Sequence, residues 1–214
     1  MNIPLPGIVL NGFIAPMSIV AWLQLALGRH MVDDATRLAT GGVESLKYFT
    51  VQSNLFSGLA CLAYVVCCGL FGPPPAWLVA LKLVATTAVM VTFLTVIAIL
   101  GRAFGWGKMY AGGNLWMHLV LPLLAAVDLC LFVPVGRLPL WVTALGMAPT
   151  LLYGVGYLAA LIRHGREENG KVYDFYGFLR WGTNRAPVVA LSMLFGSWGV
   201  ALLLYGVSSL LCMA

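Results

Sequence analysis

The chain has 214 residues, of which 61% are hydrophobic and only 9% are charged, and it carries a net charge of +5. A soluble domain has about 25% charged residues, so this composition excludes an ordinary soluble enzyme. It indicates an integral membrane protein that forms a single domain over residues 1–214.

Six hydrophobic runs are long enough to cross a bilayer core of about 30 Å. They predict an all-α polytopic membrane protein, a bundle of six transmembrane helices, because the alternating pattern of a β-barrel is absent. The first run lacks the basic start and the cleavage site of a signal peptide. The runs cover residues 8–28, 46–71, 76–100, 114–134, 139–162 and 187–211.

The second run begins with a polar stripe. Thr50, Ser53, Asn54 and Ser57 follow a spacing of i, i+3, i+4 and i+7, so they share one helical face. Polar groups in a lipid-embedded helix are costly unless they face the bundle interior. Two interpretations remain: hydrogen bonds to neighbouring helices, or the wall of a site in which Thr50 is a nucleophile.

The third and fourth runs each carry one charged residue. Lys82 and Asp128 both lie about six residues from the same end of their helices, so we expect them to pair at the same depth. We interpret the pair as a structural ion pair, with a proton or ion relay as the alternative.

His118 is the only histidine within the runs, and it lies about four residues inside the fourth. Pro122 has no N–H to bond the carbonyl of His118, so the helix can kink there. Thr50 lies equally far inside the second run, which places both groups about 6 Å below the same interface. A hydroxyl nucleophile beside an imidazole base is the smallest set of groups that can cleave an ester by nucleophilic catalysis.

Basic residues gather at one end of the predicted bundle. Loops 29–45, 101–113 and 163–186, with Lys47, hold ten Lys or Arg residues, whereas the other end holds Arg137 alone. The positive-inside rule therefore predicts cytoplasmic loops and external termini. The positive charge favours contact with anionic lipid head groups rather than nucleic acid.

The motifs around Thr50 and His118 resemble a known family. Residues 47–54 (Lys-Tyr-Phe-Thr-Val-Gln-Ser-Asn), residues 118–124 (His-Leu-Val-Leu-Pro-Leu-Leu) and Asp128 resemble the androgen-induced family of six-span membrane threonine hydrolases, most closely its bacterial relatives. Pro149, Tyr153, Tyr157 and residues 174–179 fit the later part of that pattern. The resemblance implies hydrolysis of fatty acid esters of hydroxy fatty acids, with Thr50 and His118 as catalytic residues, in a bacterial inner (plasma) membrane.

A hydrolytic mechanism assigns roles to further residues. Because no carboxylate completes a triad, Asn114, Tyr153 or a backbone carbonyl is expected to hold the His118 ring. Asn54, with Ser53 beside it, or a backbone N–H is expected to stabilise the oxyanion. Small and apolar side chains predict an acyl-chain pocket, and three basic residues are candidates to bind a substrate carboxylate, with ordinary head-group contact as the alternative. The pocket residues are Ser57, Gly58, Cys61, Leu121, Ala125 and Leu129, and the basic residues are Lys47, Arg102 and Lys108.

Two other functions remain open. A small-solute or ion transporter would be lined by the polar stripe with Lys82 and Asp128, although the chain shows no inverted repeat. A membrane acyltransferase would use the same Thr50 and His118 with an alcohol in place of water. The five cysteines fit no metal site or disulfide framework, so we expect no metal and no cofactor. The expected partners are a lipid ester and membrane lipids.

Overall fold

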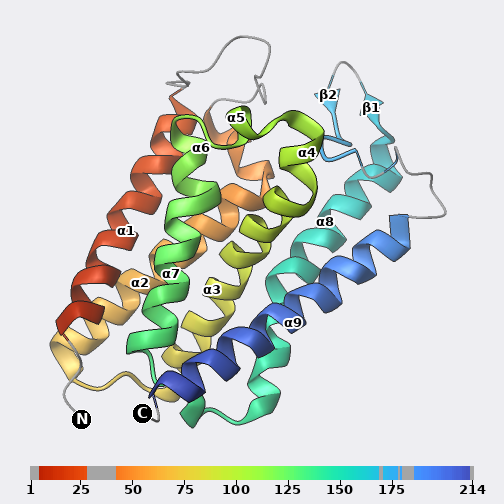
Figure 1. Cartoon of the computed structure of the whole chain (residues 1–214). Helices are drawn as coiled ribbons and strands as arrows, with labels where there is room; N and C mark the ends of the chain where they lie inside the picture. The colour runs from red at the N-terminus through yellow and green to blue at the C-terminus, as the bar shows by residue number, and fades with distance from the viewer. Residues whose placement is uncertain (1–4, 28–41, 169–170, 178, 180–185, 213–214) are drawn as a thin grey trace.

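Six long apolar helices make up the body of the protein (Figure 1). The computed structural model describes residues 5–27, 42–168, 171–177, 179 and 186–212. Each of the six segments is long and apolar enough to cross a membrane, which confirms the predicted all-α bundle and identifies an integral membrane protein. These segments are Leu5–Ala26, Phe49–Phe71, Ala76–Ala103, Gly113–Phe132, Leu140–His164 and Pro187–Leu211.

Several crossing segments are built from more than one element. Two of them contain π-helical stretches, η3 and η4, and one begins as a 3₁₀ helix, η6. The elements in chain order are α1 (Leu5–Ala26), η2 (Gly42–Lys47), α2 (Phe49–Phe71), α3 (Ala76–Thr95), η3 (Val96–Leu100), α4 (Gly101–Phe104), α5 (Trp106–Met109), α6 (Gly113–Leu115), η4 (Trp116–Val120), α7 (Leu121–Phe132), η5 (Val135–Arg137), η6 (Leu140–Met147), α8 (Ala148–His164), β1 (Glu167–Glu168), β2 (Lys171–Val172) and α9 (Ala186–Cys212).

Helices α1, α2, α3 and α7 form the packed centre of the bundle. Helices α1 and α2 approach each other closely, since a Cβ added at Gly58 would lie 2.7 Å from the Cβ of Ser18. Small residues at such a crossing allow the two backbones to come together, as is common between membrane helices.

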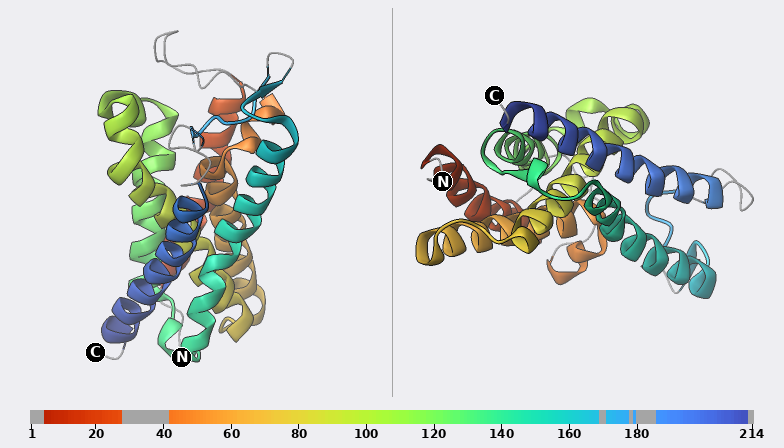
Figure 2. Two further views of the ribbon diagram at one scale, coloured as in Figure 1. Left: turned by 90° about the vertical axis from the view of Figure 1, so that its right-hand side faces the viewer. Right: turned by 90° about the horizontal axis from the view of Figure 1, so that it is seen from below.

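Helix α8 diverges from this centre toward the end of the bundle where α4, α5 and α6 lie, whereas α9 crosses the bundle obliquely and packs against α3 and α7 (Figure 2). Many of their large apolar side chains are exposed, for example Leu152 and Leu203. In a membrane protein such surfaces face lipid tails. The space between α8, α9 and the central helices is where the two cavities described below are found.

The start of α2 differs from the prediction. The second crossing helix begins at Phe49, because residues 42–47 form the short 3₁₀ helix η2 instead. The other end of α2 follows the sequence closely: Gly72 has a φ of +86°, which favours glycine, and three prolines separate it from α3.

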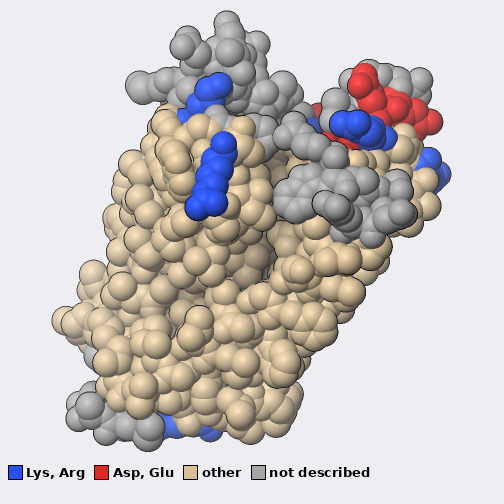
Figure 3. All heavy atoms as spheres, turned by 45° about the vertical axis from the view of Figure 1, so that its right-hand side comes forward, with Lys and Arg blue, Asp and Glu red and all other residues tan. Residues whose placement is uncertain are grey.

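The start of α1 and the end of α9 lie at one end of the bundle, and the connection through α4, α5 and α6 lies at the other end, which is called the loop end below (Figure 1). Blue basic atoms are visible mainly at the loop end (Figure 3). Among the residues whose side chains are described, Lys47, Arg102, Lys108, Arg163 and Arg166 belong to the elements and connections at that end, and Arg137 belongs to η5 at the opposite end. Arg29, Arg37, Arg180 and Arg185 fall outside the described residues.

Candidate active site

Thr50 lies in the first turn of α2 and lines a small cavity. The cavity has a volume of about 120 Å³ and lies between the start of α2, the end of α3 and the outer helices α8 and α9. Three further threonines line it, and the sequence prediction did not include them: Thr92, Thr95 and Thr150. Thr50 therefore faces a largely apolar space in which hydroxyl groups are the main polar feature.

His118 lies in the π-helical segment η4 and is 5% exposed. Its ring Nδ1 is 2.8 Å from the backbone carbonyl oxygen of Met109, at the end of α5. A carbonyl oxygen only accepts hydrogen bonds, so Nδ1 carries the proton of the neutral ring. The other nitrogen, Nε2, then has an unprotonated lone pair, which is the form that a general base requires.

Asn54 connects the elements that carry Thr50 and His118. Its Nδ2 donates to the carbonyl of Thr50 at 2.8 Å and to the carbonyl of Met117 at 3.1 Å. Both amide hydrogens are therefore in use, so Asn54 positions the backbone and does not match the predicted role of oxyanion donor. The contact shows that the first turn of α2 and the His118 segment are neighbours, as the depth argument required.

Thr50 and His118 lie on neighbouring elements, and their side chains are not bonded to each other. Among the described residues, no hydrogen bond joins the Thr50 hydroxyl to the His118 ring. Nor is His118 among the described residues that line either cavity. A reaction that uses both groups therefore needs the hydroxyl and Nε2 to come within hydrogen-bond distance when the substrate binds.

The other predicted polar residues bond elsewhere. Ser53 Oγ lies 3.0 Å from Thr92 Oγ1 and links α2 to α3. Asn114 donates to the carbonyl of Lys108, and Tyr153 donates to the carbonyl of Lys47. Of the three groups expected to hold the His118 ring, it is thus a backbone carbonyl that does so.

The six residues predicted to hold an acyl chain lie instead in packed helix contacts. Cys61, Leu121 and Ala125 belong to one buried apolar cluster and Leu129 to another, while Gly58 lies against Ser18. Ser57 is buried as well. None of the six lines either cavity. Their small size lets helices approach rather than leaving room for a ligand.

The three basic candidates occupy two different places. Lys47 lines the larger cavity, and its Nζ lies 5.4 Å from the ring centroids of both Tyr48 and Phe175. Arg102 and Lys108 are exposed on α4 and α5 and line neither cavity. Only Lys47 is placed to meet a ligand in a cavity.

The predicted contact between Lys82 and Asp128 is present at the centre of the bundle. Lys82 Nζ is 2.7 Å from Asp128 Oδ2, and the two side chains are 1% and 0% exposed. Asn11, which the sequence analysis did not single out, donates to Asp128 Oδ1 at 2.6 Å and accepts from Lys82 at 2.7 Å. Cys61 Sγ lies 3.1 Å from the same ammonium. The network joins side chains from α1, α2, α3 and α7, and its role as a structural ion pair rather than a relay stays a prediction.

An aromatic segment, residues 173–177, lines both cavities. Tyr173 and Phe175 line the larger cavity, and Tyr176 lines the smaller one. The hydroxyl of Tyr176 accepts a hydrogen bond from the backbone N–H of Phe49, the first residue of α2. Burial raises the pKa of Tyr176 to about 12, so the phenol stays neutral at physiological pH. Tyr176 thus caps the turn that carries Thr50 from a position far away in the sequence.

Comparisons with known proteins give no assignment. No protein-family model, no curated protein and no solved structure matches the chain. The functional conclusion therefore depends on the geometry of the site and on the sequence motifs.

Proposed function

We propose that this protein hydrolyses lipid esters within the membrane, with Thr50 as nucleophile and His118 as general base. The observation that carries the proposal is the bond between His118 Nδ1 and the Met109 carbonyl, which leaves Nε2 unprotonated. A buried imidazole in a membrane helix is rare and costly, and this one is held in the form that removes protons. The resemblance to membrane threonine hydrolases points to the same two residues.

The first half of the reaction transfers the acyl group to the protein. Thr50 Oγ attacks the ester carbonyl carbon, and its proton passes to His118 Nε2. The tetrahedral intermediate then expels the alcohol oxygen, which takes the proton back from Nε2. An acyl-threonine ester remains and the alcohol leaves. The cavity lined by Thr50 is the proposed place for the acyl chain.

The second half restores the enzyme. Water gives a proton to His118 Nε2 and attacks the acyl-threonine carbonyl, and Thr50 regains a proton as the carboxylic acid leaves. Asn54 contributes by holding the Thr50 turn against the His118 segment. If an alcohol takes the place of water, the same steps describe an acyltransferase, so product analysis with lysolipid acceptors separates these two activities.

The proposal is tested with purified protein in lipid nanodiscs and a long-chain p-nitrophenyl ester. Thr50→Ala and His118→Ala should each lower turnover by roughly 100-fold to 10,000-fold, the usual contribution of general acid–base catalysis. Thr150→Ala is the matched control, because Thr150 lines the same cavity without a proposed role. A fluorophosphonate should label the parent protein and not Thr50→Ala.

Two results would overturn this mechanism. One is full turnover by a folded Thr50→Ala or His118→Ala variant. The other is an equal loss in Thr150→Ala, which would show that the cavity rather than the Thr50 hydroxyl determines the rate.

We further propose that the site lies near the cytoplasmic face of a bacterial inner membrane, because it is at the basic end of the bundle (Figure 3).

A further inference from the structure

The Thr50 cavity is smaller than the acyl chain of a membrane lipid. Its volume of about 120 Å³ compares with about 150 Å³ for a protein cavity that binds benzene, a molecule of six carbons. By this comparison the Thr50 cavity holds about five carbons. A long acyl chain whose ester carbonyl lies at Thr50 must therefore leave the cavity on one of its sides.

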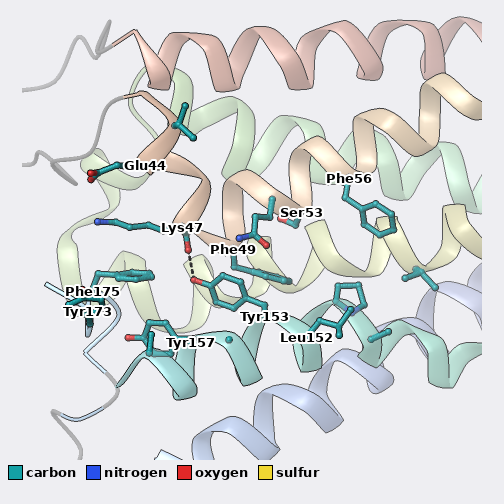
Figure 4. A pocket seen from close by; sticks show the side chains of 17 residues that line it. Glu44, Lys47, Phe49, Ser53, Phe56, Leu152, Tyr153, Tyr157, Tyr173 and Phe175 are labelled. Carbon is teal, nitrogen blue, oxygen red and sulfur yellow. Dashed lines mark hydrogen bonds between the residues drawn. The ribbon is translucent and has the colours of Figure 1, made fainter. Parts of the chain in front are cut away.

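Packed or bonded side chains line the cavity on most sides. Toward the larger cavity, a groove of about 820 Å³, the rings of Phe49 and Tyr153 lie side by side with centroids 5.1 Å apart (Figure 4). Toward the bundle centre, Thr92 is 4% exposed and its Oγ1 lies 3.0 Å from Ser53 Oγ. Toward the loop end, Tyr176 lines the cavity and bonds the first residue of α2. A chain that left on any of these sides would have to separate these contacts.

On the remaining side the cavity reaches the surface of the bundle. Gly154 of α8 and Ala190 of α9 line this side and are half-buried. A Cβ added at Gly154 would meet nothing within 4 Å, so there is open space beside it. Ile99, where the third crossing segment borders the cavity, is 38% exposed. Three further half-buried apolar side chains complete this side: Leu158, Val189 and Met193.

This opening lies at the depth of the lipid tails. Gly154, Ala190 and Ile99 all belong to segments that are long and apolar enough to cross a membrane. Gly154 lies ten residues before His164, the last residue of α8, which is about 15 Å at 1.5 Å per residue. A chain that passes between Gly154 and Ala190 therefore enters lipid rather than water.

We infer that the acyl chain of the substrate leaves the Thr50 cavity between Gly154 and Ala190, and that its distal part stays in the bilayer. This inference rests on the proposed function, because it places the ester carbonyl at Thr50. It defines the substrates as esters whose acyl chain has about five carbons or more, with no upper limit on its length. The lack of bulk at the two positions makes the opening, so Gly154 and Ala190 are specificity-determining residues.

This path predicts how the rate depends on chain length. The first carbons fill the cavity, and each gains dispersion contacts that an empty space would lack. Carbons beyond the opening are surrounded by lipid tails both before and after binding, so they add no binding free energy. With substrate counted per mole of lipid, kcat/KM should rise by roughly tenfold to 100-fold from the acetyl to the hexanoyl ester. From there to the hexadecanoyl ester it should change by no more than about twofold.

Matched leucine substitutions test the opening, with the full chain in lipid nanodiscs and a series of p-nitrophenyl esters. Gly154→Leu narrows the opening from α8 and Ala190→Leu narrows it from α9, so each should lower the ratio of hexadecanoyl to acetyl turnover by about tenfold or more. Gly156→Leu is the control, because Gly156 lines the groove and a Cβ added there also meets nothing within 4 Å. Its ratio should equal that of the parent.

Two results of this series would overturn the chain path. One is an unchanged ratio in both Gly154→Leu and Ala190→Leu. The other is a kcat/KM that keeps rising or falls steeply between the hexanoyl and hexadecanoyl esters, since the protein would then enclose the whole chain or exclude its distal part.

A labelling measurement tests the path without hydrolysis. The probe is 2-octadecanone with a diazirine about six carbons from the carbonyl, at the expected distance of the opening; it keeps a carbonyl but has no ester bond. After illumination, peptide mapping of the parent and of Gly156→Leu should find the label in residues 189–193 of α9, and Gly154→Leu should lose it. Equal labelling of these residues in Gly154→Leu would overturn the path. Turnover that survives in Thr50→Ala contradicts the mechanism but leaves this result intact, so the two failures are distinguishable.

Discussion

At the scale of single residues, depth along a helix predicted which side chains meet, whereas small side-chain size did not predict where a cavity lies. Lys82 and Asp128 were expected to meet because they lie equally far from one end of the bundle, and they do. Asn11 completes their network and was missed, although an amide inside an apolar run is a comparable signal. The Met109 carbonyl that holds His118 could not have been identified, since a backbone group leaves no trace in the sequence.

Substitution of the buried lysine should show what the ion pair contributes. Lys82→Met leaves the Asp128 carboxylate buried without a cation, and the loss in free energy of unfolding should be about 3–5 kcal/mol. The double variant Lys82→Met with Asp128→Leu removes both charges and should recover most of that loss. Thermal unfolding in detergent measures both. Equal instability of the single and double variants would contradict a role limited to charge pairing.

At the scale of elements, the apolar runs predicted the six crossing helices because about 20 apolar residues match the bilayer thickness. Whether a small residue marks a ligand pocket or a close helix contact could not be predicted in the same way. Gly58 suggests equally a ligand pocket or a close helix contact, and only the position of α1 decides between them. The capping of α2 by Tyr176 was likewise hidden, because the two residues that bond are 127 positions apart.

The contact between α1 and α2 gives a matched pair of substitutions in one helix. A Cβ at Gly58 would lie 2.7 Å from Ser18, whereas one at Gly69 meets nothing within 4 Å. Gly58→Ala should therefore lower the free energy of unfolding by about 1–3 kcal/mol through overpacking. Gly69→Ala should be neutral or slightly stabilising, because alanine favours helix. Adding Ser18→Gly to Gly58→Ala should restore stability if the clash is the cause, and no recovery would refute it.

At the scale of the whole molecule, the two ends of the bundle differ. The half near the chain ends is packed around an apolar cluster that includes Tyr64 and Leu129, whereas both cavities are lined by the aromatic segment 173–177 at the loop end. The sequence predicted which end is basic, and the two described cavities and Thr50 lie at that end. The sequence could not predict that α8 would diverge from the central helices while α9 crosses α3 and α7 (Figure 2), because an apolar helix surface does not specify which helix it packs against.

The charge difference between the ends predicts the orientation in a cell membrane. Alkaline phosphatase fused after Ala214 should be active and green fluorescent protein fused there should be dark, since the C-terminus is expected outside. Fusions that follow Tyr110, in the basic connection between the third and fourth crossing segments, should give the opposite pair of signals. The reverse pattern at both positions would show that the basic end faces outward.

The π-helical segment η4 determines how two side chains of the fourth crossing segment are oriented relative to each other. A π segment arises where an α-helix accommodates one surplus residue. With that residue, His118 meets the Met109 carbonyl while Asp128, ten positions later, meets Lys82. Deleting a single residue from η4 would leave the span hydrophobic and nearly as long, yet it would rotate one of the two side chains relative to the other by about 100°. The orientation of His118 relative to Asp128 thus depends on one inserted residue.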